Sequence, residues 1–141
     1  MKTKDLRQEV EFNASAHEVY EMLMDSRKHA EITGGKASIS REIGGKSTAF
    51  GDWLMAINIE LVPNKKIVQK WRGADWPDGH FSLATFEIED DRNGSKLVFT
   101  QTGIPYDKYD DISDGWKDHY WEKMKKIFKK LLDTSPVSPT R

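Results

Sequence analysis

Four histidines, His17, His29, His80 and His119, carry the side chains best suited to acid–base or metal chemistry near neutral pH. None stands in a metal-ligand spacing such as HExxH, and the chain has no cysteine to complete a site. We therefore expect surface or structural roles for all four, with His119 on the polar side of the last helix. The same absence of motifs predicts no metal and no other cofactor.

Phosphate chemistry is not supported either. The sequence contains no Walker loop, no GxGxxG fingerprint and no GxSxG elbow. Its two Gly-Gly-Lys segments, 34–36 and 44–46, resemble phosphate loops only superficially and are predicted to be turns.

Binding of an apolar ligand is the chemistry that the large side chains favour, because they alternate along strand-like segments and so share one face. In segment 52–61 the odd positions include Trp53, Met55 and Ile57. Segments 66–72, 80–89 and 96–102 contribute Gln69, Trp71, Phe86, Phe99 and Gln101. These faces form either an ordinary core or a pocket lined by apolar groups, in which the two glutamines would orient a ligand.

Residues 113–132 are predicted to form one closing amphipathic helix, with a wide aromatic face. Trp116, Tyr120 and Met124 share a stripe that Trp121 and neighbouring apolar residues widen, so they are candidate ligand contacts. Lys117 projects into the same arc and would sit at the rim of a pocket. Five lysines between 123 and 130 lie opposite, as a solvated face or as a docking face for an acidic partner.

The elements that must position these residues follow the order strand, two helices, six strands and one long helix. A strand is expected near 6–13 and helices near 15–24 and 26–33, with Ser15 and Glu18 forming a capping box. Further strands are expected at 37–43, 46–50, 52–61, 66–72, 80–89 and 96–102, joined by short turns. The fold class is therefore α+β, with a curved seven-stranded antiparallel sheet that grips the closing helix.

Composition limits the classes of protein that remain. A chain of 141 residues predicts one domain, over 1–132, followed by a disordered tail over 133–141. The net charge of −1 gives no electrostatic case for nucleic acid. No stretch approaches the ~20 apolar residues of a membrane span, and no signal peptide is present, so we expect a cytoplasmic protein without a membrane partner.

Several segments together resemble a known family. They are Ile39–Lys46, Phe50-Gly51, Glu60–Arg72, Trp76–His80, Gln101–Pro105, Gly115-Trp116 and Tyr120-Trp121. The chain resembles the homologues of the Hsp90 ATPase activator (AHSA1-like), within the START-like, Bet v 1-like (SRPBCC) superfamily, over about residues 5–132. This resemblance implies the helix-grip fold.

Three functions remain open from the residues and the resemblance. The leading hypothesis is non-enzymatic binding of a hydrophobic, aromatic or lipid-like small molecule between sheet and closing helix, by a monomer or weak dimer. The second is a co-chaperone-like module that binds an Hsp90-type ATPase. The third is an enzyme like the polyketide cyclases of the superfamily, with Tyr120 inside the cavity and Arg72 and His80 at its rim.

Overall fold

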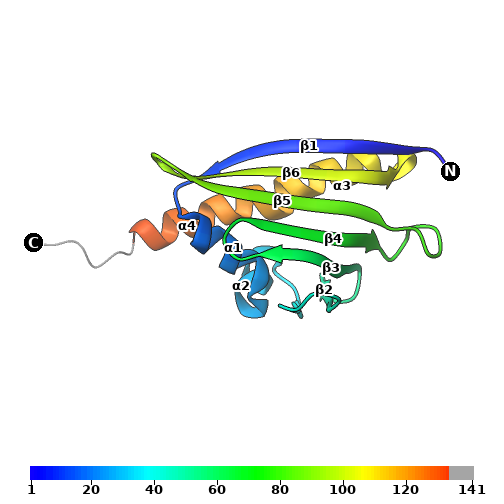
Figure 1. Ribbon diagram of the computed structural model, residues 1–141, viewed down its shortest axis with the longest axis horizontal. Coiled ribbons are helices and arrows are strands. Elements are labelled where there is room, and N and C mark those ends of the chain that lie inside the picture. The colour runs from blue at the N-terminus through cyan, green and yellow to red at the C-terminus, as the bar shows by residue number, and fades with distance from the viewer. Residues whose placement is uncertain (134–141) are drawn as a thin grey trace, which may run out of the picture.

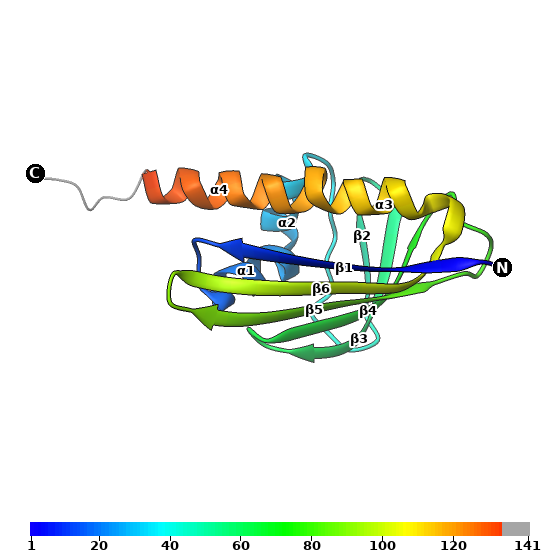
Figure 2. The same cartoon turned by 90° about the horizontal axis from the view of Figure 1, so that it is seen from above.

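Tight turns fold most of this chain into successive hairpins. The computed structural model describes residues 1–133 and shows an α+β protein in which one long helical segment lies across one face of an antiparallel sheet (Figures 1 and 2). The strands are β1 (Thr3–Phe12), β2 (Lys46–Ala49), β3 (Leu54–Val62), β4 (Lys66–Gly73), β5 (Ser82–Asp91) and β6 (Gly94–Pro105). The helices are α1 (Ala16–Met24), α2 (Ser26–Thr33), α3 (Tyr109–Trp116) and α4 (Glu122–Asp133).

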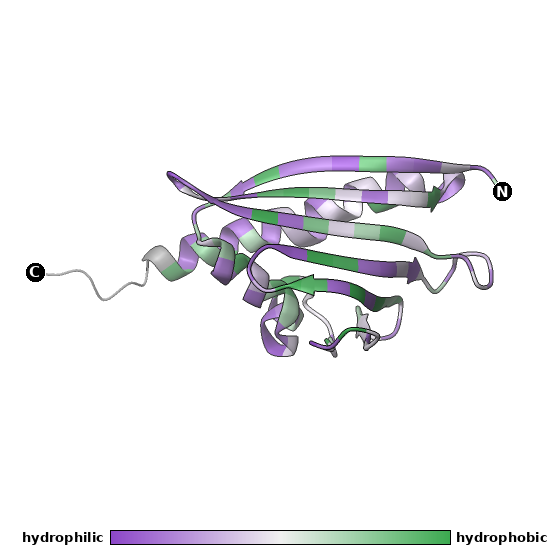
Figure 3. Cartoon of the chain, viewed as in Figure 1, coloured by the Kyte–Doolittle hydropathy of each residue, from purple (hydrophilic) through white to green (hydrophobic). Residues whose placement is uncertain are grey.

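The sheet has the order β1-β6-β5-β4-β3-β2, and every neighbouring pair is antiparallel. Hairpins explain the run from β2 to β6, because short connections favour antiparallel neighbours. The first strand then pairs with the last, which brings the N-terminal residues beside the end of β6. Hydropathy alternates along the strands, as expected for a sheet with one covered and one exposed face (Figure 3).

The sheet contains six strands within residues 1–133, so the prediction of seven is wrong. Segment 37–43 contributes only an isolated bridge between Ser38 and Thr48. Its backbone is bound elsewhere, since the Ser40 amide donates to the Ser47 hydroxyl (2.9 Å). The Gly44 amide likewise donates to the Asn58 carbonyl (2.7 Å). These bonds hold the segment as a loop against the edge of β3.

The first two helices follow the predicted pattern. Ser15 caps α1 and forms a capping box with Glu18, which satisfies backbone donors at the helix start. Gly34 ends α2 in the left-handed conformation (φ 72°) that glycine adopts without steric cost. Asp90 of β5 accepts from the Ala16 amide (2.8 Å) and so ties the start of α1 to the sheet.

The closing helical segment starts earlier than expected and is not uniform. A single 3₁₀ turn at Tyr106–Lys108 leads into α3, and a π-helical turn at Lys117–Trp121 joins α3 to α4. The Glu122 amide donates to the Lys117 carbonyl, the i→i+5 bond of a π turn. Asp133 closes α4, and residues 134–141, where a tail is predicted, lie outside the described residues.

The inner face of β3 is the reverse of the prediction. Leu54, Ala56 and Asn58 are buried, whereas Met55 and Ile57 lie on the outer face. A bulge between Asn58 and Glu60 is the physical reason, because one extra residue switches the side that later positions face. After the bulge the odd position Leu61 packs against the core, so the predicted face holds only there.

Asn58 holds this irregular region together. Its Nδ2 donates to the carbonyls of Ser40 (2.8 Å) and Glu42 (3.0 Å), and its Oδ1 accepts from Gln69 (3.0 Å). The side chain is buried, so its loss would take a partner from the Ser40 carbonyl and from the buried Gln69 amide, whereas the Glu42 carbonyl would keep the Gly45 amide.

We predict that Asn58→Ala lowers the free energy of unfolding by about 2–3 kcal/mol, because buried polar groups then lose their hydrogen bonds. Urea denaturation followed by tryptophan fluorescence measures the change. Ile59→Ala at the bulge, where the side chain is exposed, should cost less than about 1 kcal/mol. Equal losses for the two variants would contradict the role assigned to Asn58.

Candidate functional site

The contact between the closing helix and the sheet is built around Trp116. Its ring centroid lies 4.4 Å from that of Phe99 and 4.5 Å from that of Tyr120. Trp71 and Phe86 lie 5.7 Å away on the sheet side. Tilted and edge-on contacts at these separations are the favourable geometries for aromatic pairs, so this cluster is a cohesive core.

The π turn at Lys117–Trp121 lies in the part of the helical segment that packs on that core. A π turn advances fewer degrees per residue than an α turn, so it changes the phase of the residues beyond it. Tyr120 and Trp121 are both buried beside Trp116. Lys117 is exposed and does not enter the aromatic face, which corrects the prediction that placed it at a pocket rim.

A buried polar network joins the helix to the sheet. The indole Nε1 of Trp116 donates to Oε1 of Gln101 (2.8 Å), and Nε2 of Gln101 donates to the Ser82 hydroxyl (2.8 Å). The Ser82 hydroxyl in turn donates to the Trp71 carbonyl (2.9 Å). Gln101 therefore binds the protein through both ends of its amide. Gln69, predicted with it to orient a ligand, donates to Asn58.

A second polar contact crosses from α2 to the π turn. His29 places Nδ1 2.9 Å from the Leu23 carbonyl and Nε2 2.8 Å from the Tyr120 hydroxyl. A carbonyl only accepts, so Nδ1 carries the hydrogen and Nε2 accepts from the tyrosine. Burial lowers the pKa of His29 and raises that of Tyr120, so both are neutral at pH 7. This confirms a structural role for His29.

Side chains fill most of the space between sheet and helix, apart from one small internal cavity and an aromatic crevice of about 120 Å³ beside α3, which Trp53, Trp71, Trp116 and Tyr120 help to line. The cavity that Gln69, Trp71, Phe86, Trp116 and Tyr120 help to line has a volume of only about 20 Å³. That is room for about one water molecule, whereas sites for drug-sized ligands measure roughly 300–1,000 Å³. The geometry therefore gives no support to the predicted internal site for a hydrophobic ligand.

The structure brings together most, but not all, of the predicted ligand contacts. Those that meet in the interior are Gln69, Trp71, Phe86, Phe99, Gln101, Trp116, Tyr120 and Met124. Met55, Ile57 and Lys117 are directed elsewhere, and Trp53 lies at the surface with 37% of its area exposed. Neither Asn58 nor Ser82 is singled out from the sequence, because each is one polar residue within an apolar strand. That polarity is the only signal in the sequence that marks them.

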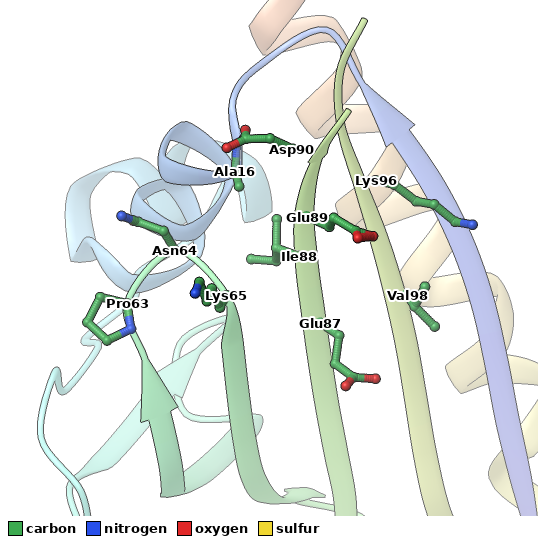
Figure 4. Close-up of a pocket in the computed structure, with 10 residues that line it drawn as sticks. All are labelled: Ala16, Pro63, Asn64, Lys65, Glu87, Ile88, Glu89, Asp90, Lys96 and Val98. Carbon is green, nitrogen blue, oxygen red and sulfur yellow. The ribbon is translucent and has the colours of Figure 1, made fainter. Parts of the chain in front are cut away.

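A wide, open depression lies on the outside of the sheet. It has a volume of about 730 Å³, and its lining mixes charged and apolar side chains, as Figure 4 shows. It forms where β5 and β6 extend beyond β4, which pairs with β5 only over Lys66–Trp71. It is lined by Glu87 and Glu89 as well as by Lys65 and Lys96. Negative and positive side chains are therefore mixed there, and neither sign predominates.

The residues considered for catalysis have structural partners. Arg72 donates to the carbonyls of Trp76 (2.8 Å), Pro77 (3.2 Å) and His80 (3.3 Å), which holds the loop after β4. His80 binds the Gly103 carbonyl through Nε2 (2.7 Å). Within residues 1–133, no group of three or more His, Asp or Glu side chains is arranged to hold a metal ion. No helix in that range is long and apolar enough to cross a membrane.

An antiparallel sheet that holds a long C-terminal helix through an aromatic core defines the class of helix-grip domains. The family model described as activator of Hsp90 ATPase homolog 1-like protein matches residues 13–129. The chain therefore belongs to that family.

Known relatives agree in sequence and in fold. The chain is 31% identical over 127 residues to the activator of 90 kDa heat shock protein ATPase homolog of Dictyostelium discoideum, covering 89% of this chain and 33% of the relative. With activator homolog 1 of Homo sapiens it shares 30% identity over 117 residues, covering 83% of this chain and 35% of the relative. It thus spans about a third of these relatives.

Among solved structures, an Hsp90 activator from Plasmodium falciparum is similar with a TM-score of 0.81 at 20% identity, covering 90% of this chain and 96% of that one. The Aha1 dimer from Colwellia psychrerythraea gives a TM-score of 0.76 at 17% identity, with 89% and 96% covered. At this identity the likeness shows the fold alone.

We predict that Gln101→Leu lowers the free energy of unfolding by about 2 kcal/mol, because the Trp116 indole N–H then loses its buried acceptor. Urea unfolding measures the loss, and near-ultraviolet circular dichroism reports the packing of Trp116. The adjacent change Thr102→Val, at an exposed position, is the control and should stay within about 0.5 kcal/mol of the wild type. A Gln101 variant as stable as this control would contradict the network.

We also predict that acid weakens the fold through His29. Burial depresses its folded pKa below the ordinary value of about 6.5, so the unfolded chain binds the proton first as pH falls. The contribution of His29 is complete above about pH 6.5 and is lost below it, at no more than about 1.4 kcal/mol per pH unit.

Free energies of unfolding measured from pH 8 to pH 5 test this. His29→Gln keeps a donor and an acceptor but cannot titrate, so the difference between wild type and variant should shrink as pH falls. A difference that stays constant across this range would contradict the assignment.

Proposed function

We propose that this chain is a protein-binding module that acts on an Hsp90-type ATPase. Membership of the activator family supports this function, as do relatives that are named as activators of the 90 kDa heat shock protein ATPase. The observation that carries it is the largely filled interior, whose cavities of about 20 Å³ and 120 Å³ are smaller than the roughly 300–1,000 Å³ of sites for drug-sized ligands. A helix-grip domain with too little room inside for a drug-sized ligand has its surface available for recognition.

The exposed face of α4 is the surface that best fits docking. Lys123, Lys125, Lys126 and Lys129 are exposed there, opposite the buried Met124 and Phe128. Lys125 has an exposed intrahelical partner, Glu122, at 3.5 Å. Pairs of this kind are weak in water, so an acidic partner can replace them. The face would therefore attract an acidic surface on the chaperone.

Charge along the closing helical segment is divided between its ends. Residues 107–118 contain five aspartates and two lysines, whereas 119–130 contain five lysines and one glutamate. This arrangement complements the helix macrodipole, which favours acids near the N-terminus and bases near the C-terminus. It also gives the segment two ends of opposite sign, which would orient a charged partner during encounter.

We predict that the wild-type protein stimulates the ATPase of its host's Hsp90-type chaperone, and that Lys125→Glu with Lys129→Glu weakens binding about tenfold or more, because attraction becomes repulsion. Steady-state ATPase rates and pull-down at two salt concentrations measure this. Binding of the wild type should fall as salt rises.

A matched control carries Lys36→Glu with Lys46→Glu, which makes the same change in net charge at exposed positions away from α4. It should bind within about twofold of the wild type, because charges outside the interface change only the long-range attraction between the two proteins. Failure of the folded wild type to bind or stimulate the chaperone would overturn the proposed function. Equal losses in both double variants would overturn the role of α4.

A further inference from the structure

An apolar strip runs along the outer face of β3, on the side of the sheet away from the closing helix (Figure 2). Met55 and Ile57 are half-buried there, and Ile59 keeps 45% of its area exposed at the bulge. Alternate residues of a strand lie about 6.7 Å apart, so the strip is about 13 Å long. Contiguous exposed apolar surface with a polar rim is typical of a contact with a partner.

Cations flank the strip on both sides. Ile57 is paired with Lys46 of β2 on one side and with Lys70 of β4 on the other, and directly paired residues point to the same face. Met55 is likewise paired with Arg72 of β4. Neighbouring strands lie about 4.8 Å apart, so the two rows of cations are separated by the width of the apolar strip.

These three cations have no carboxylate partner. Within residues 1–133, neither lysine nor Arg72 belongs to an ion pair. The hydrogen bonds of Arg72 go to neutral carbonyls, which leave its charge in place. Where β1 and β6 form the same face, the cations are neutralised instead, because Arg7 (2.6 Å) and Lys96 (3.1 Å) share Glu9. The positive charge around the strip is therefore available to a partner with carboxylates.

A hollow of about 220 Å³ lies at the Met55 end of the strip. Its lining residues are Lys46, Thr48, Asp52, Trp53, Met55, Arg72 and Ala74. Two cations against one carboxylate, Asp52, leave the hollow positive. A dry cavity of about 150 Å³ holds a benzene ring, so the hollow has room for one large apolar side chain. Only Trp53 is common to this hollow and to the crevice beside α3.

The arrangement of charge decides which partner fits. A single small anion would leave the apolar strip between the cations uncovered. An amphipathic helix, about 10–12 Å in diameter, can cover the strip with its apolar stripe while carboxylates on both margins of that stripe reach the two rows of cations. Helix residues three or four positions apart are separated by about 4.5–6 Å along the axis, which is close to the spacing of the side chains on β3.

We infer that the outer face of β3 is a docking site for an acidic amphipathic helix of a protein partner, with one large apolar side chain in the hollow. The carboxylates of that helix face Lys46 on one side and Lys70 with Arg72 on the other. This inference goes beyond the proposed function, since it concerns the opposite side of the sheet from α4. It does not require the chaperone to be the partner.

The test is an NMR titration of the full chain with a capped, alanine-based peptide of about four helical turns. The peptide carries leucines at every third or fourth position and glutamates on both sides of that stripe. Shifts should concentrate on the methyl groups of Met55, Ile57 and Ile59. A peptide of equal composition with its leucines scattered around the helix should bind about tenfold more weakly, because it buries less apolar area. Replacing the glutamates by lysines should abolish binding at about 0.1 M salt.

Two variants test the site itself. Lys70→Glu should weaken binding of the glutamate peptide about tenfold, because attraction becomes repulsion. Its control, Lys28→Glu on α2, makes the same change in charge at an exposed position and should bind as the wild type does. Ile57→Thr keeps a β-branched residue but removes apolar area, and should weaken binding about fivefold. Its control is Val98→Thr at a half-buried outer position of β6, which should leave binding unchanged.

Four results would overturn the inference. The first is equal affinity for the striped and the scattered peptide, and the second is unchanged binding by folded Lys70→Glu and Ile57→Thr. The third is a set of peptide-induced shifts confined to α4. The fourth is the same shifts at β3 when the protein alone is concentrated, or with phosphatidylserine vesicles, which would make the face a contact between copies or a site for lipid headgroups.

Failure here and failure of the proposed function are distinguishable. The chaperone ATPase assay depends on Lys125 and Lys129 of α4, whereas the peptide titration reads out the opposite side of the sheet. A protein that binds the peptide but does not stimulate the chaperone would overturn only the proposed function, and the reverse result would overturn only this inference.

Discussion

The hydrogen bond from the Trp116 indole to Gln101 is the interaction on which the rest of the structure depends. It is buried, so breaking it would leave a polar group without water or partner. It also joins the last helical segment to the middle of the sheet, within a cluster of tilted aromatic rings. The hydrogen bond orients the helical segment on the sheet. Most of the favourable free energy comes from the aromatic area buried around that bond.

This way of closing the core leaves little room between helix and sheet. A ligand between sheet and helix needs space that the side chains beneath the helix leave free, and here aromatic rings and a glutamine occupy most of that space. What remains is a helical segment whose outer side is acidic at one end and basic at the other. An aromatic crevice adjoins the acidic end, and exposed lysines cover the basic end. These two ends of opposite charge are the basis of the protein-binding role that we propose.

Much of this arrangement could be predicted from local patterns. The inner faces of β4, β5 and β6 follow from alternation. Trp71, Phe86 and Phe99 each lie in a strand in which every second residue is apolar or buried. The first strand, both short helices and the capping box at Ser15 likewise depend on neighbours within a few residues. Segment 37–43 misled the same reasoning, because its alternation was real but its backbone bonds went to Ser47 and Asn58 instead of a strand.

By itself, the sequence determined the α+β class, the order of elements apart from one strand too many at 37–43, and the identity of the aromatic helix face, since these depend on periodicity and turn chemistry. Only the tertiary structure decided the inner face of β3, where a bulge reverses the side that Met55 and Ile57 face. It also decided the outward position of Lys117, the π turn that begins there, the contact between His29 and Tyr120, and the packing of the interior. In each case, the side that a residue faces or the space that a side chain fills is set by partners distant in the chain. No local pattern in the sequence carries that information.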